Sequence, residues 1–439
     1  MADSAKQFLN KIVPDTFDFM LICESTRTVV SRLSESLIQA NTSISDMDVW
    51  LRVFRDNRTG LSHGPSLDVS SLQTMVDEAV VSWKNATRQS QVTAPTELKT
   101  SFDPVNDPAI LNENPVQRAV KLEKAVSAAN RHGLCYSGAF TTSAATRELM
   151  TRNGLDVTAS GTSIDVSCTL THSESGTGWA RGFSTRLRDI DPIALTVKAG
   201  GKALNGRRKT TLKPGRYTVV LEPAAVASML LFLAFLSFGG SVYNRGTSFM
   251  SGKIGQKVMP KHITISDEPS DPVSHGWPFD YEGVPTKDIT LIENGIAKAV
   301  VHDMQTASSA GIKSTGHALS PGNTFGPYPR CLKIAPGPKS IKSILPDTGK
   351  AILVSRLWYI NYVNPMRTMI TGSTRDGTFL LRNGAIESAV QDMRFEESIL
   401  EAFRRSVVIS SEKEYVRQFG STLCVPWMVI PDFTFTEVI

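Results

Sequence analysis

A run of apolar residues from Val226 to Phe238, VASMLLFLAFLSF, constrains the fold of this chain more than any other feature. It carries no charged side chain and spans about thirteen residues, whereas a helix that crosses a bilayer needs about twenty. A helix that is apolar on every side is normally buried inside a protein. We therefore expect a buried helix here, with no side facing solvent and no membrane span.

The composition describes a globular protein with two domains. The chain has 439 residues, too many for one ordinary hydrophobic core. Hydrophobic residues make up 41% and charged residues 20%, as is typical of folded proteins. The formal net charge is only +5 and no dense cluster of lysine and arginine occurs, so nucleic acid is not favoured as a partner.

The cysteines and the N-terminal residues indicate a reducing compartment. The first twenty residues carry charges throughout and lack the apolar core of a signal peptide, so we expect a cytoplasmic protein. Five cysteines are scattered without a CxxC pair, which favours buried free thiols over disulfides or a zinc knuckle. These are Cys23, Cys135, Cys168, Cys331 and Cys424.

Residues 1–200 are predicted to form a mixed α/β domain. Short alternating runs over residues 27–64, interrupted by the turn sequence DNRTG, predict a β-hairpin or a β-meander. Helical spacing follows over residues 71–87 and again over 115–133, where Pro115 suits a first helical turn. Further strands are expected around residues 133–154 and 162–173, and a Pro-, Asn- and Asp-rich surface connection over residues 93–115.

Residues 201–439 are predicted to form a second, β-rich domain, which makes the whole chain α+β. A glycine-containing basic turn leads into the strand YTVVLE and then into the apolar helix. Downstream, short alternating runs are separated by the sequences ENG, RDG and RNG, which are signals for β-hairpins. The second domain is therefore expected to be mainly antiparallel sheet around a buried apolar helix.

The order of motifs in the second domain resembles the TldD/PmbA family, also called modulator of DNA gyrase proteins. Seven segments carry the resemblance in the family's order: GKIGQKV (252–258), FDYEGVPT (279–286), LIENG (291–295), STGHA (314–318), TGSTRDGTFLLRNG (371–384), MRFEESIL (393–400) and the closing VPWMVIPDFTFT. The first domain is similar more loosely, over residues 49–64 and 188–204. The resemblance implies a protein that works as one of a pair.

In that pair, TldD is a metallopeptidase whose HExxxH helix and a late cysteine hold a metal, whereas TldE or PmbA lacks the motif. The bound metal polarises the scissile carbonyl and activates water, and the glutamate can move the proton. Side by side, Leu231 and Phe232 take the places of the first His and the Glu, and Leu236 takes that of the second His. Leucine and phenylalanine cannot ligate a metal.

The resemblance and the missing ligands together imply a TldE/PmbA-like subunit without catalytic residues or a cofactor of its own. Its expected partner is a TldD-like metallopeptidase that carries zinc, in a heterodimer that processes peptides. A homodimer is a further possibility. Extended peptide would be held by strand addition through main-chain hydrogen bonds.

A metal site elsewhere is not favoured by the sequence. No two of the seven histidines have the spacing that places both on one helical face. His262 and His275 flank ISDEPSD, which could form a loop site with oxygen and nitrogen ligands, but such surface loops are common. Cys424 falls in the region of the family's late cysteine, yet a small buried hydrophobe is the preferred interpretation.

The loop STGHALSPGNTFGPYPR, residues 314–330, is the candidate for peptide or partner binding, because loops of this length in compact domains are usually functional. Thr315, His317 and Asn323 are its candidate residues. Asp280 and Glu282 would share a face if they lay on a strand, which suggests a carboxylate dyad, although turn capping or hydrogen bonding at an interface is preferred.

Two functions from other classes remain open. A stand-alone, metal-independent enzyme of a specialised biosynthetic pathway would pair His317 with Cys331 as base and nucleophile. A modulator that binds DNA or gyrase rests on the family's second name and a small positive charge. The sequences GxxxxGK[ST] and GxSxG are absent, which argues against nucleotide hydrolysis and α/β-hydrolase chemistry.

Overall fold

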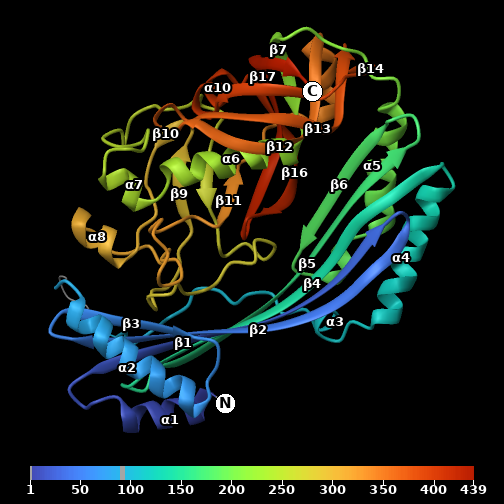
Figure 1. Cartoon of the computed structure of the whole chain (residues 1–439). Coiled ribbons are helices and arrows are strands. Elements are labelled where there is room, and N and C mark those ends of the chain that lie inside the picture. The colour runs from blue at the N-terminus through green and yellow to red at the C-terminus, as the bar shows by residue number, and fades with distance from the viewer. Residues whose placement is uncertain (1, 89–93) are drawn as a thin grey trace.

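The computed structural model describes residues 2–88 and 94–439, and its first unit is built on one long antiparallel sheet (Figure 1). The strand order is β3-β2-β1-β4-β5-β6. The predicted meander over residues 27–64 is confirmed as the first three strands. The bounds are β1 Asp18–Ser34, β2 Leu37–Arg55, β3 Arg58–Gly64, β4 Leu134–Thr151, β5 Asp156–His172 and β6 Thr177–Ser184.

Helices pack against this sheet in two groups, one near each end (Figure 1). The first group is α1 (Ala2–Ile12) and α2 (Val69–Asn85), and the second is α3 (Pro108–Leu111), α4 (Pro115–Asn130) and α5 (Pro192–Asn205). Pro115 is the first residue of α4, as predicted, and the side chain of Asn114 caps the helix. Thr93, the first residue of the predicted connection 93–115, lies outside the described residues.

The second unit contains an eleven-stranded mixed sheet. Most neighbouring strands are antiparallel, but β12 pairs with β7, and β11 with β17, in parallel. Its strands are β7 Gly215–Leu221, β8 Ile265–Asp267, β9 Ile289–Glu293, β10 Ile296–Ala297, β11 Cys331–Ile334, β12 Lys350–Asn364, β13 Met369–Arg382, β14 Ala385–Ala389, β15 Met393–Ser398, β16 Val408–Gln418 and β17 Ser421–Val438. Its helices are α6 Pro223–Ser237, α7 Gly240–Asn244, α8 Met304–Ala310, α9 Ile341–Ile344 and α10 Ile399–Arg405. The α+β class is confirmed.

The three predicted hairpin turns have different outcomes. ENG joins β9 to β10 and RNG joins β13 to β14, as expected. The prediction for RDG is wrong, because Asp376 and Gly377 lie inside β13, where the pairing with β12 shifts register. Both residues have positive φ, which suits a β-bulge as well as a turn. Asp376 is held there by an ion pair with Arg356 of β12.

The long strands of the first unit curve beneath the second unit, and the two touch at separate places (Figure 1). Near one end, Met20 and Leu149 of the first sheet pack on Phe279 and Tyr281. At the other, the ammonium of Lys202 in α5 lies 2.7 Å from the carboxylate of Glu222. The predicted domain boundary near residue 200 falls within α5, and the division into 1–200 and 201–439 stays a prediction.

Candidate functional site

Helix α6 begins at the point where the two units meet. Pro223 occupies its first turn directly after β7, a position where the missing N–H costs nothing. The preceding residue, Glu222, does not cap the helix with its side chain. Its carboxylate instead accepts hydrogen bonds from Lys202 and from the Ser355 hydroxyl, at 2.7 and 2.9 Å. The start of α6 is thereby tied to α5 of the first unit and to β12.

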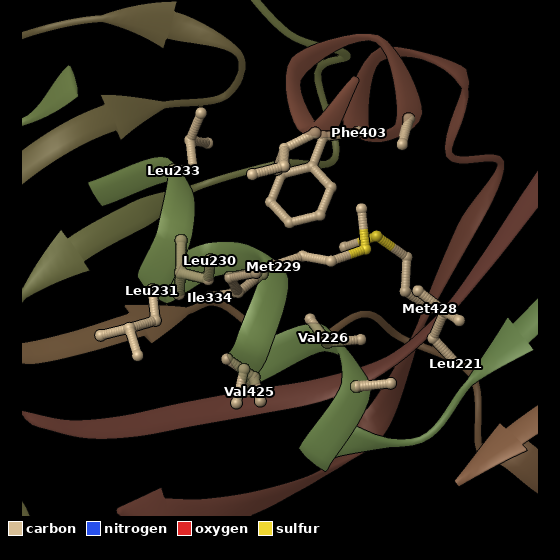
Figure 2. Close-up of a cluster of buried hydrophobic side chains, with 14 of the residues drawn as sticks. Leu221, Val226, Met229, Leu230, Leu231, Leu233, Ile334, Phe403, Val425 and Met428 are labelled. Atoms are coloured by element: carbon tan, nitrogen blue, oxygen red, sulfur yellow. The ribbon is translucent and has the colours of Figure 1, made fainter. Parts of the chain in front are cut away.

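The middle of α6 is part of the main core of the second unit. Leu231 is 0% exposed, like its neighbours Met229, Leu230 and Leu233. Figure 2 shows these side chains among residues from the surrounding strands and α10, including Leu221, Ile334, Phe403, Val425 and Met428. Within the described ranges, no helix is both long and apolar enough to cross a membrane.

One face of α6 is open, so the prediction of a helix without a solvent-facing side is wrong in this respect. Phe232, Phe235 and Leu236 are only half-buried, and their spacing places them on one face. Aromatic rings lie against this face, one from β12 and one from the candidate loop. The Tyr328 ring stacks on Phe235 at 4.7 Å, and the Tyr362 ring lies 5.1 Å from that of Phe232.

The three positions that were predicted to align with HExxxH have different surroundings. Leu231 points into the core, whereas Phe232 and Leu236 lie on the open face. All three offer only carbon atoms, so this helix does not fit a zinc ion. Across residues 2–88 and 94–439, no group of three or more His, Cys, Asp or Glu side chains is arranged to hold a metal.

A pocket of about 530 Å³ lies beside the first turns of α6. Phe232 forms part of its wall, together with Trp358 and Tyr359 of β12 and with Phe419. Tyr359 and Phe419 are 77% and 82% exposed, which is unusual for aromatic side chains. Exposed aromatic clusters of this kind are typical of surfaces that bind another protein. We call this group the aromatic face.

A second cavity, of about 150 Å³, lies between the two units. One wall is the first sheet, through residues such as Glu24 of β1 and Arg147 of β4. The opposite wall consists of loop residues 267–281 and of the candidate loop 314–330. We call this space the interdomain cavity, and both Asp280 and His317 line it.

His317 and Cys331 are brought near each other but do not form a base–nucleophile pair. The Nε2 of His317 lies 2.9 Å from the Asp267 carboxylate, and its Nδ1 lies 2.9 Å from Thr315 oxygens. Cys331 donates its backbone N–H to Asp267 and its thiol to the Ser274 carbonyl. Burial raises the pKa of the Cys331 thiol well above its usual value, which disfavours the thiolate. The arrangement supports a rigid loop rather than cysteine chemistry.

Asp280 and Glu282 lie in a turn rather than on a strand, so they do not form a dyad on one face. The Asp280 carboxylate accepts backbone N–H groups from Glu282, Val284 and Ala318, within 2.8–2.9 Å. Its role is to hold the turn 279–286 against the candidate loop. Glu282 instead accepts the N–H of Met304 at 2.7 Å.

Glu282 also reaches the first unit, where Arg52 lies 3.7 Å away. Burial raises the pKa of the Glu282 carboxyl to about 7, despite the opposing effect of Arg52. The folded state therefore holds this proton more tightly than the unfolded state, in which the pKa is about 4.5. The protonated Glu282 carboxyl therefore stabilises the folded state fully when the pH is below the unfolded pKa. This stabilisation is lost as the pH rises towards about 7.

We predict that Glu282→Gln removes a pH-dependent loss of stability. Between about pH 5 and about pH 8, wild type should lose about 3 kcal/mol of unfolding free energy more than the variant does. Urea unfolding at the two pH values measures this difference. Glu293→Gln, at an exposed ion pair with Lys298, is the matched control and should keep the wild-type dependence. Equal pH dependence in wild type and Glu282→Gln would contradict the assignment.

The remaining predicted residues lie apart from the interdomain cavity or act locally. The Asn323 side chain accepts the N–H of Phe325 and holds an exposed turn. His262 hydrogen-bonds Ser406, whereas His275 lines the cavity, so these two histidines have different surroundings. Cys424 is a buried free thiol on β17, opposite Tyr415.

Sequence reasoning missed the charged residues of the cavity. Glu24 and Arg147 form an ion pair at 2.7 Å although they lie far apart in the chain, and Arg330 and Arg417 line the same space. Glu24, Arg147 and Arg417 belong to no recognisable local motif, and Arg330 is the last residue of the candidate loop but was not among its candidate residues. The adjacency of Glu24 and Arg147 follows only from the register of β1 against β4, in which the two residues are direct partners.

The fold defines a class: a two-part α+β chain whose second unit is built around an apolar helix. Residues 214–437 match the PmbA/TldA metallopeptidase C-terminal domain, and residues 21–82 match PmbA/TldA metallopeptidase domain 1. The chain belongs to the PmbA/TldD family.

Three relatives illustrate the range of similarity. The crystal structure of TldE from Thermococcus kodakarensis superposes with a TM-score of 0.88 at 20% identity, and the alignment covers 99% of each chain. An uncharacterized protein of Methanocaldococcus jannaschii is 22% identical over 406 residues, covering 90% of this chain and 92% of that protein. The metalloprotease PmbA of Escherichia coli O157:H7 is 26% identical over 216 residues, which is 48% of this chain and 44% of PmbA.

Proposed function

We propose that this chain is the non-catalytic subunit of a peptide-processing complex, paired with a TldD-like metallopeptidase that carries HExxxH and zinc. The observation that carries the proposal is the chemistry of α6. Its metal-motif positions hold Leu231, Phe232 and Leu236, and Leu231 is part of the core. A chain of this family with such a helix has no means of activating water by zinc at that position.

The aromatic face supports the second half of the proposal, which concerns the partner. It lies beside the first turns of α6 and includes Phe232, one of the motif positions on the open side of the helix. Exposed Trp and Tyr side chains are enriched in protein interfaces, where they bury a large area at little entropic cost. A metallopeptidase subunit docked here would cover Trp358, Tyr359 and Phe419, and it would bring its own active site near the junction of the units.

Co-expression with an HExxxH-bearing member of the family tests the proposal. We expect the two chains to co-purify in equal amounts, with one zinc in the partner and peptidase activity only in the complex. The chain alone should contain no stoichiometric zinc and should not cleave peptides. Chelator-sensitive cleavage by the isolated chain would overturn the proposal.

Substitution of the aromatic face tests where the partner binds. Tyr359→Asp together with Trp358→Asp should reduce co-purification by about tenfold or more, because charge is introduced into the centre of the interface. Val81→Asp is the matched control, since Val81 is an exposed apolar residue on α2 of the first unit. If both substitutions reduce co-purification equally, the aromatic face is not the docking site.

A further inference from the structure

Two arginines line the interdomain cavity without a carboxylate partner. Arg330, at the end of the candidate loop, donates one hydrogen bond, from Nη2 to the Gly420 carbonyl at 3.3 Å. Arg417, on β16, lies over the ring of Phe183 at 5.3 Å and makes no hydrogen bond or ion pair within residues 2–88 and 94–439. Partly buried arginines usually form an ion pair with a carboxylate. Because Arg330 and Arg417 do not, their guanidinium groups are available to bind an anion.

The carboxylates of the same cavity bind groups other than these two arginines. Glu24 is held by Arg147 and by the Tyr281 hydroxyl. Asp267 is paired with His317, and Asp280 accepts three backbone N–H groups. Arg330 and Arg417 therefore have no carboxylate in contact among the described residues, although the three arginines and three carboxylates of the lining balance in formal charge.

The two guanidinium groups lie close enough to affect each other. Burial and the charge of Arg330 lower the pKa of Arg417 to about 10. Burial, with both arginines, lowers the pKa of His275 to about 3, so this imidazole is neutral. Two cations held near one another in a poorly solvated space destabilise each other, and an anion bound between them would relieve that cost.

Further polar groups of the cavity have no good partner within the part of the chain that the structure describes. The hydroxyl of Tyr328 is buried near Ser421 but makes no well-formed hydrogen bond, and the buried Nε2 of His275 is in the same situation beside Gly161. Tyr328 and His275 both line the cavity. The wall formed by the first sheet adds the hydroxyl groups of Thr26 and Ser163.

We propose that the interdomain cavity binds a carboxylate of an extended peptide, held between Arg330 and Arg417. Guanidinium groups bind carboxylates through paired, charge-assisted hydrogen bonds, and the Tyr328 hydroxyl can donate a further one. The volume of about 150 Å³ suits a terminal residue or an acidic side chain rather than a folded segment. The choice of a peptide as the source of the carboxylate rests on the proposed function; the preference for an anion does not.

Fluorescence anisotropy on the full chain, without a partner, tests this site. The probes are three fluorescein-labelled peptides of Ser, Val and Gly: one with a free C-terminal carboxylate, one amidated, and one amidated with an internal Glu. We expect at least one carboxylate peptide to bind about tenfold more tightly than the neutral amide. Preference for the first identifies the terminus as the source, and preference for the third identifies the side chain. Equal binding of all three, or no binding, overturns the proposal.

Arg330→Gln and Arg417→Gln should each remove about tenfold in affinity for the preferred peptide, and should leave binding of the neutral amide unchanged. Neither variant loses an ion pair, so melting temperature should not fall. Arg216→Gln, at an exposed arginine outside the cavity, is the matched control. Wild-type preference in Arg417→Gln, or an equal loss in Arg216→Gln, also overturns the proposal. Co-purification with the metallopeptidase is scored separately, so failure of this site is distinguishable from failure of the pairing.

Discussion

Replacement of Arg147 by methionine is expected to lower the free energy of unfolding by about 3–5 kcal/mol. Arg147 is almost wholly buried on β4, and its guanidinium joins the two units. Its Nε and Nη2 donate to Glu24 at 3.0 and 2.7 Å, and its Nη1 donates to the Phe279 carbonyl at 3.0 Å. Methionine would fill most of the volume but leave the half-buried Glu24 carboxylate without its cation, which is the costly part of the change.

The aromatic rings around Arg147 add to this expected loss. The guanidinium lies 4.0 Å from the ring centre of Tyr281 and 4.6 Å from that of Trp277. Both rings belong to the loop that forms one wall of the interdomain cavity. Cation–π contacts of a desolvated arginine stabilise by about 2 kcal/mol or more. Loss of Arg147 should therefore loosen the contact between the units as well as the first sheet.

Chemical unfolding of three variants separates these contributions. Glu24→Gln combined with Arg147→Met removes both charges, and should be more stable than Arg147→Met alone by about 1–3 kcal/mol. Arg382→Met is the matched control, because its ion pair with Glu387 is exposed and such pairs contribute about 1 kcal/mol or less. A change below about 1 kcal/mol in Arg147→Met would show that the buried pair does not hold the units together.

Local patterns predicted the fold where neighbouring residues decide the structure. The spacing of Leu72, Met75 and Val76 gave α2, and Pro115 marked the start of α4. The RDG bulge was missed because Asp376 and Gly377 adopt positive φ in a bulge as readily as in a hairpin turn. Sequence signals of this kind report backbone conformation and not whether the strand continues.

The candidate site was predictable only in part, for a different physical reason. The apolar character of α6 was evident, but hydropathy does not tell that Phe232 and Phe235 meet aromatic rings on a half-buried face of the helix. The interdomain cavity depends on contacts between distant segments, such as Arg147 with Phe279. Such contacts leave no periodic signal in the sequence. The candidate loop was found because its length and glycine content are local properties.

Introduction of the first histidine of the metal motif, Leu231→His, is expected to destabilise the chain by about 3 kcal/mol or more. The substitution removes a fully buried leucine from the core shown in Figure 2 and leaves an imidazole with no hydrogen-bond partner there. Leu236→His is the matched control on the same helix. Because Leu236 is half-buried on the open face, its imidazole can reach water, and we expect a loss of about 1 kcal/mol.

Comparison of these two variants by urea unfolding, together with zinc analysis, separates a structural helix from a dormant metal site. Neither variant should bind stoichiometric zinc, because a single imidazole supplies one of the several ligands that zinc requires. Equal destabilisation by the two substitutions, or zinc binding by Leu231→His, would contradict the core position of Leu231. If the expected difference is found, recovery of the motif would require repacking of the core around position 231 as well as new ligands. The loss of catalysis proposed for this chain would then be built into the packing of α6.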